Sequence, residues 1–107
     1  MLIYGDATFY APGVMTEVLA NRIAWGHVQP CPECIGMVAL ADCGQLGARA
    51  WIIGPRGMEG QFLVTDCGTF LTPGRVAEVD WDTAQRWGMR GPVEVIVLIP
   101  EADDDGY

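Results

Sequence analysis

The sequence has 107 residues, enough for one compact domain, and half of it is hydrophobic, so a true core can form. The net charge is −8 and all six cations are Arg residues scattered along the chain, which argues against the clustered positive charge of a nucleic-acid-binding surface. No apolar run approaches the roughly 20 residues of a membrane span.

The first half of the chain predicts a strand, a helix and two further strands. A strand is expected at 7–11 and is ended by "APG". Residues 14–25 carry apolar side chains and Arg22 at helical spacing, which predicts a short amphipathic helix. After a Pro-rich loop, strands are expected at 36–40 and 48–53.

The second half predicts three more strands and one short helix. "GPRGMEG" indicates a turn, and the final run at 92–99 is so continuously apolar that we expect burial on both of its faces. Asp82 is a plausible N-cap of the helix, and Gly88 a plausible stop. The expected strands and helix are 61–65, 75–79, 82–87 (the helix) and 92–99.

Six short strands, two short helices and many Gly and Pro turns predict a mainly β domain, either a small closed barrel or a sandwich. A doubly wound α/β fold would need helices between most strands. We expect the domain to occupy 1–100 and "EADDDGY" at 101–107 to form an acidic disordered tail.

The four cysteines leave three interpretations open: two disulfides, a zinc site begun by "CPEC", or free thiols. Disulfides would suit an extracytoplasmic domain. Cys43 and Cys67 each follow an acid just past a predicted strand end, so a bridge there would hold two acids near each other. The predicted disulfide pairs are Cys31–Cys34 and Cys43–Cys67.

Three stretches resemble known bacterial cell-wall domains. "GDATFYAPG" is similar to the opening of rare-lipoprotein-A-like domains, and "GRVAEVDWDTAQRWGMRGPVEVIVLI" is similar to their end. The latter segment, "ALADCGQLGARAWI" and "LVTDCG" also resemble the three-aspartate domain of lytic transglycosylase A and stationary-phase survival proteins. Both families are double-psi β-barrels, so the resemblance implies a six-stranded double-psi β-barrel.

The resemblance also implies a peptidoglycan-directed function. In its enzymatic form the protein would be a lytic transglycosylase that cleaves the β-1,4 bond between the two peptidoglycan sugars. The three family acids correspond to Asp42, Asp66 and Asp80. One carboxyl would protonate the leaving oxygen and then accept a proton from the sugar's own hydroxyl, with Asp80 the first choice. Acids gathered in one groove would raise the pKa of at least one of them.

The sequence departs from both patterns. In rare-lipoprotein-A-like enzymes the acid matching Asp66 works with a His, whereas His27, the one histidine here, lies in a different loop. Asp80 also fits a helix cap, and Asp42 and Asp66 fit ordinary turns.

Four further residues are expected to border the glycan, because tryptophan stacks on sugar rings, the family's opening motif lies beside the groove, and Glu78 shares a strand face with Asp80. These residues are Thr8, Tyr10, Glu78 and Trp81.

The leading hypothesis is therefore a peptidoglycan-directed module in the form of a lytic transglycosylase. Its expected partner is cell-wall polysaccharide, without a cofactor or metal, a nucleic-acid partner or a membrane span. A non-catalytic binding or structural module, in a virion or surface assembly, is the alternative, and a zinc-stapled intracellular domain is a third. We expect an extracytoplasmic location, in the cell envelope, secreted or virion-associated, although the first ten residues contain no secretory signal. The oligomeric state is left open.

Overall fold

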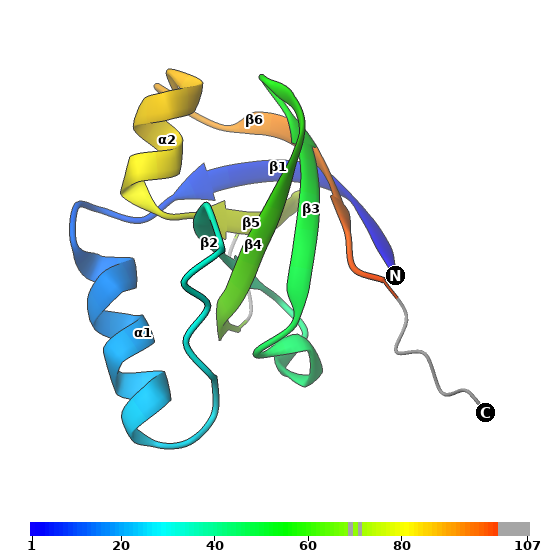
Figure 1. Cartoon of the computed structure of the whole chain (residues 1–107). Coiled ribbons are helices and arrows are strands. Elements are labelled where there is room, and N and C mark those ends of the chain that lie inside the picture. Colours follow the sequence, from blue (N-terminus) through cyan, green and yellow to red (C-terminus); the bar gives the residue numbers. More distant parts are fainter. Residues whose placement is uncertain (69, 71, 101–107) are drawn as a thin grey trace.

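The computed structural model describes residues 1–68, 70 and 72–100. Six strands form a closed barrel in the order β1-β5-β2-β4-β3-β6, and both α-helices lie on the same side of it (Figure 1). The elements in chain order are β1 (Leu2–Phe9), α1 (Val14–Ala24), β2 (Gly36–Leu40), the 3-10 turn η1 (Cys43–Gln45), β3 (Arg49–Gly54), β4 (Gly57–Cys67), β5 (Arg75–Val79), α2 (Trp81–Trp87) and β6 (Val93–Leu98).

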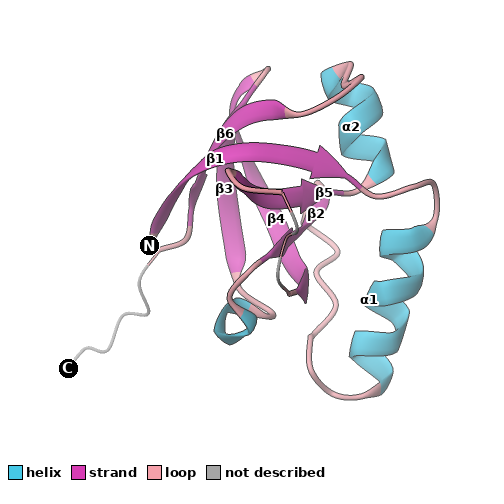
Figure 2. Ribbon diagram, turned by 180° about the vertical axis from the view of Figure 1, so that it is seen from behind, coloured by secondary structure: helices cyan, strands magenta, loops and turns pink. Residues whose placement is uncertain are grey.

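Two parallel strand pairs distinguish this barrel from a simple meander. β1 runs parallel to β5 and β2 runs parallel to β4, while the other neighbours are antiparallel. Figure 2 shows the same arrangement from behind. The predicted mainly β fold, a closed six-stranded barrel with two helices, is confirmed. The predicted acidic tail lies outside the described residues.

The barrel interior is filled by one side of every strand. Each strand alternates its side chains, so closing the sheet leaves one inner face and one outer face. The side chains buried inside come from all six strands: Ala7, Val38, Leu40, Ala50, Ile52, Phe62, Val64, Ala77, Val79, Val95 and Val97.

The last strand was expected to be buried on both faces, and this is wrong. Val95, Val97 and Ile99 are buried, whereas Ile96 and Leu98 are partly exposed. On the outer face they lie opposite Tyr4 and Leu2 of β1. The apolar run therefore supplies both the core and an outer apolar surface.

Two predicted boundaries also change. β1 begins at Leu2, because residues 2–7 pair with β6. The turn or short loop predicted at 54–60 is shorter than expected: Gly54 pairs with Gly57 in a tight hairpin, and β4 starts at Gly57. In both cases pairing with a distant or adjacent strand extends the strand beyond its local apolar pattern.

The second helix is capped by Asp80 and not by Asp82. The Asp80 carboxyl accepts from the Thr83 N–H, and Gly88 ends the helix with φ 69°, a left-handed conformation that glycine adopts readily. Asp82 instead lies in the first turn. Gly36 allows α2 to approach β2, since a Cβ there would lie 2.5 Å from the Thr83 hydroxyl.

The first helix is attached to the barrel mainly at one buried side chain. Met15 is the one fully buried residue of α1, and its sulfur accepts a hydrogen bond from Thr65 of β4 at 3.0 Å. No helix among residues 1–68, 70 and 72–100 is long and apolar enough to cross a membrane.

All four cysteines are joined as predicted, in the disulfides Cys31–Cys34 and Cys43–Cys67. The first closes the loop between α1 and β2 on itself. The second links η1 to the end of β4. Because the thiols are paired with each other, the zinc and free-thiol interpretations are wrong.

Removing the two disulfides should have unequal effects on stability. Their sequence separations are 24 and 3, and a longer loop restricts the unfolded chain more. We expect Cys43→Ala with Cys67→Ala to lower the free energy of unfolding by about 3 kcal/mol, and the Cys31/Cys34 pair by about 2 kcal/mol. Chemical denaturation of both double variants measures this; a larger loss from the Cys31/Cys34 pair would contradict it.

Candidate functional site

Strand register places three of the predicted site residues in one row on the outside of the barrel. Thr8 of β1 lies opposite Glu78 of β5, Glu78 lies opposite Ala39 of β2, and Ala39 lies opposite Asp66 of β4. Directly opposed residues point to the same face of a sheet. The flanking residues Ala77 and Val79 are fully buried, so the row containing Glu78 faces outward.

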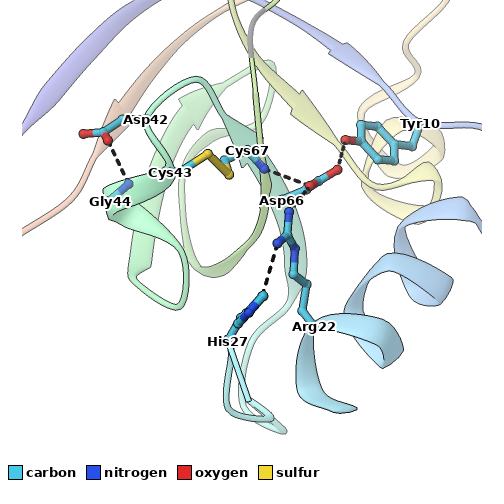
Figure 3. The surroundings of a disulfide bond; sticks show 8 residues. All are labelled: Tyr10, Arg22, His27, Asp42, Cys43, Gly44, Asp66 and Cys67. Atoms are coloured by element: carbon cyan, nitrogen blue, oxygen red, sulfur yellow. Dashed lines mark hydrogen bonds and ion pairs between the residues drawn. A yellow bond between two sulfur atoms is a disulfide. The ribbon is translucent and has the colours of Figure 1, made fainter. Parts of the chain in front are cut away.

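Asp66, which belongs to this row, is the centre of a hydrogen-bonded group (Figure 3). Its Oδ2 accepts from the Tyr10 hydroxyl at 2.6 Å. Its Oδ1 accepts from Arg22 Nη2 at 2.8 Å and from the Cys67 N–H at 2.9 Å. The three partners belong to the chain just after β1, to α1 and to the last residue of β4.

This environment keeps Asp66 ionised. Partial burial on its own raises the pKa of the carboxyl, but the hydrogen bonds from Tyr10, Arg22 and the Cys67 N–H outweigh that cost. The pKa of Asp66 is therefore held below its usual value. The sequence predicted a raised pKa among the grouped acids, and for Asp66 the direction is the opposite.

Tyr10 is held in its protonated form by the same contacts. Burial raises the pKa of its phenol first, the hydrogen bond to Asp66 and the Asp66 charge raise it further, and the Glu78 charge adds to the effect. Arg22 acts in the other direction. Tyr10 is thus a fixed hydroxyl beside two carboxylates, and Glu78 is close enough to act on it electrostatically.

Arg22 was not predicted as a site residue, although its position carried a signal. It shares the apolar side of α1 with Met15, and its side chain is 19% exposed. An arginine on a helix face that packs against the fold needs a partner acid, which is Asp66. A second nitrogen, Nη1, donates to His27 Nδ1 at 3.3 Å, so His27 joins the group from the following loop.

Thr8 and Trp81 lie beside the group in supporting positions. The Thr8 hydroxyl is buried without a hydrogen-bond partner, so direct contact with a ligand would require a different rotamer. Trp81 packs its ring against Phe9 with centroids 5.7 Å apart, which joins the start of α2 to the end of β1.

Asp80 lies apart from this hydrogen-bonded group. It is 6% exposed, and its two carboxyl oxygens accept from the Thr83 N–H, the Thr83 hydroxyl and the Met37 N–H. The two Thr83 bonds cap α2, and the Met37 bond ties the start of that helix to β2. The geometry therefore favours the helix-cap interpretation of Asp80 over the proton-donor interpretation.

Asp42 is also placed in a local structural contact. Its carboxyl is exposed and accepts from the Gly44 N–H at 2.8 Å, capping η1. The Cys43–Cys67 disulfide joins the residues that directly follow Asp42 and Asp66. In Figure 3, however, the two carboxyls lie on either side of the bridge. The structure thus joins Asp66 with Tyr10, and it places Asp42 and Asp80 in other contacts.

The described residues contain no group of three or more His, Cys, Asp and Glu side chains that could hold a metal ion. A hollow of about 630 Å³, lined by Arg49, Trp51 and Gln61, contains none of the predicted site residues, whereas a smaller hollow of about 240 Å³ is lined in part by Asp80. Arg49 there is already paired with Glu33 at 2.9 Å. Because the Asp80 carboxyl beside the smaller hollow is occupied by bonds from Met37 and Thr83, the Asp66 group is the stronger candidate site.

Solved structures of similar fold support the barrel architecture. The fold resembles an expansin of Clavibacter michiganensis in its apo form, with a TM-score of 0.62, 17% identity, and coverage of 96% of this chain and 52% of that one. An aspartate-to-asparagine variant of that expansin in complex with cellohexaose matches with a TM-score of 0.60 and 17% identity over 99% and 54%.

These likenesses show the fold, a double-psi β-barrel of the kind that the sequence predicted. This chain spans about half the length of the solved structures it matches. No family model and no curated protein matches the sequence.

Substitution of Asp80 should affect stability and spare any glycan-directed function. Asp80→Ala removes three acceptor contacts and should lower the free energy of unfolding by about 1–2 kcal/mol, whereas Asn is itself a good cap and should cost less. Denaturation curves should show the free energy of unfolding falling in the order wild type, Asp80→Asn, Asp80→Ala. An Asp80→Asn variant with unchanged stability but no glycan binding or cleavage would instead restore Asp80 to the site.

The pairing of Asp66 should contribute stability that depends on pH. Its pKa is depressed in the folded state, so the contribution is present above the usual Asp value of about 3.9 and is lost as pH falls through the folded pKa. We expect Asp66→Asn to cost up to about 1 kcal/mol at pH 7 and progressively less below pH 4. Asp42→Asn is the control. A stability difference that persists unchanged at pH 2.5 would contradict the assignment.

Proposed function

We propose that this protein is a cell-wall polysaccharide-binding module that recognises a β-1,4-linked glycan at the Asp66 group. One observation carries the proposal: an outward-facing carboxylate is held ionised and fixed between Tyr10 and Arg22. Sugars present many hydroxyl donors, and a charged acceptor makes stronger hydrogen bonds to them than a neutral one.

The charge balance of the chain fits a neutral partner better than an anionic one. The net charge is −8, and Arg22 is already paired with Asp66. Nucleic acid would need an unpaired basic surface. A glycan makes no such demand, and the solved expansin complex with cellohexaose is a protein of similar fold with a β-linked oligosaccharide bound.

Binding without cleavage is the version that the geometry supports best. A general acid must carry a proton at the working pH. Asp66 has a lowered pKa, and Asp80 is a buried cap with three donors directed at it. Neither is arranged as the proton donor that a lytic transglycosylase requires.

Glu78 provides the one observation in favour of a catalytic second candidate. It is a second, half-buried carboxyl on the same outer row, close enough to Tyr10 to raise the pKa of that phenol. In a transglycosylase built here, Glu78 would transfer the proton and the Asp66 carboxylate would stabilise positive charge on the sugar. Asp42 would support neither step, because its carboxyl caps η1.

The two disulfides support an oxidising compartment for either version. A secreted, cell-envelope or virion-associated location is our proposal for that setting, because cell-wall polysaccharide would be accessible there.

Glycan binding should depend on Asp66. We expect wild-type protein to bind cellohexaose or glycan-strand hexasaccharides from purified sacculi in calorimetric titrations. Asp66→Asn should weaken binding at least tenfold, because it removes a charged acceptor worth about 1.5–3 kcal/mol. Asp42→Asn is the matched control and should bind normally.

Digestion of purified sacculi separates binding from cleavage. We expect no anhydro-muropeptides from the wild type. Their release, together with its loss in Glu78→Gln, would establish the second candidate. Absence of binding to both hexasaccharides and to intact sacculi would reject a glycan-directed function altogether.

A further inference from the structure

Trp25 lies at the far end of the same series of contacts that begins at Tyr10. Tyr10 bonds to Asp66, Asp66 to Arg22, and Arg22 to His27, while His27 packs against the Trp25 ring with centroids 5.9 Å apart. The series therefore runs from the end of β1, across the end of β4, to the C-terminal end of α1.

Trp25 is uncovered to an unusual degree for its type. It is 64% exposed, whereas Trp87 is 7% exposed and Trp51 and Trp81 are partly buried. Leaving most of an indole in water forgoes a large part of the apolar burial that this side chain can provide. Nothing in the barrel core requires the residue at this position, because α1 packs through Met15.

The backbone of Trp25 and the neighbouring His27 ring, which contacts the indole, are nevertheless held by hydrogen bonds. Trp25 is the C-cap of α1, where its backbone N–H bonds to Asn21, and the His27 N–H bonds to the Arg22 carbonyl at 2.9 Å. The His27 ring is in turn tied to Arg22 because its Nδ1 accepts from the guanidinium. An aromatic side chain fixed in this way loses little further freedom on binding a ligand.

We propose that Trp25, positioned by His27, is a stacking subsite that extends the glycan site beyond Asp66, and this inference rests on the proposed function. The chemistry is complementary along the series. Tyr10, Asp66 and Arg22 offer hydroxyl and charged groups to the hydroxyls of a sugar ring. Trp25 offers an apolar aromatic surface to the C–H face of a ring. A glycan of several residues would engage both, so binding should gain more from Trp25 as the glycan lengthens.

Chain-length dependence tests the subsite. Wild type, Trp25→Ala and Asp66→Asn are titrated with cellobiose and cellohexaose, and with disaccharide and hexasaccharide glycan strands from sacculi. We expect Trp25→Ala to weaken hexasaccharide binding by roughly threefold to tenfold and to weaken disaccharide binding by a smaller factor. Tyr4→Ala is the control, since Tyr4 is 62% exposed and belongs to the start of β1.

Quenching of tryptophan fluorescence by acrylamide supplies a second readout. Because Trp25 is the most exposed tryptophan, hexasaccharide should protect the wild type from quenching and should not protect Trp25→Phe. Normal hexasaccharide binding by Trp25→Ala, with binding still lost in Asp66→Asn, would overturn this inference alone. Failure of the wild type to bind any of the four probes would overturn the proposed function together with it.

Discussion

Closure of six strands into a barrel is the constraint on which the rest of the structure depends. It fixes one inward and one outward set of side chains for every strand. With Ala77 and Val79 inside, Glu78 must face out, and the register then carries the same outward face to Thr8 and to Asp66. The candidate site follows from the packing of the core beneath it.

The ion pair of Asp66 with Arg22 connects this surface to the first helix. α1 has a single fully buried side chain, so its position against the barrel relies on Met15 near one end and on Arg22 near the other. Both contacts reach β4, at Thr65 and at the adjacent Asp66. The same pair holds the Asp66 carboxylate charged and oriented. The Asp66–Arg22 pair therefore both attaches α1 to the barrel and orients the Asp66 carboxylate of the candidate site.

Much of the fold could be predicted from local patterns, because strand alternation, helix spacing and turn residues were consistent with each other. The Cys43–Cys67 disulfide followed from two cysteines beside predicted strand ends, which left Cys31 and Cys34 as the other pair. The limits of β1 and β4 could not be predicted from local patterns, since pairing with β6 and β3 extends these strands past their apolar runs. The site was predicted in part: Asp66 and Tyr10 meet, whereas Arg22 was seen only as a helix residue. Asp80 was the first choice as proton donor although it also fitted a helix cap, and its contacts with Met37 and Thr83 favour the cap.

The central claim is that the outward face around Asp66 is where a glycan binds. Titration of isotope-labelled protein with cellohexaose or a sacculus-derived hexasaccharide, followed by backbone amide NMR, tests it most directly. We expect shift changes concentrated at Tyr10, Arg22, Cys67 and Glu78, with little change at Met37, Thr83 and Arg49. Shifts concentrated instead around Arg49, Trp51 and Gln61, or around Asp80, would contradict it.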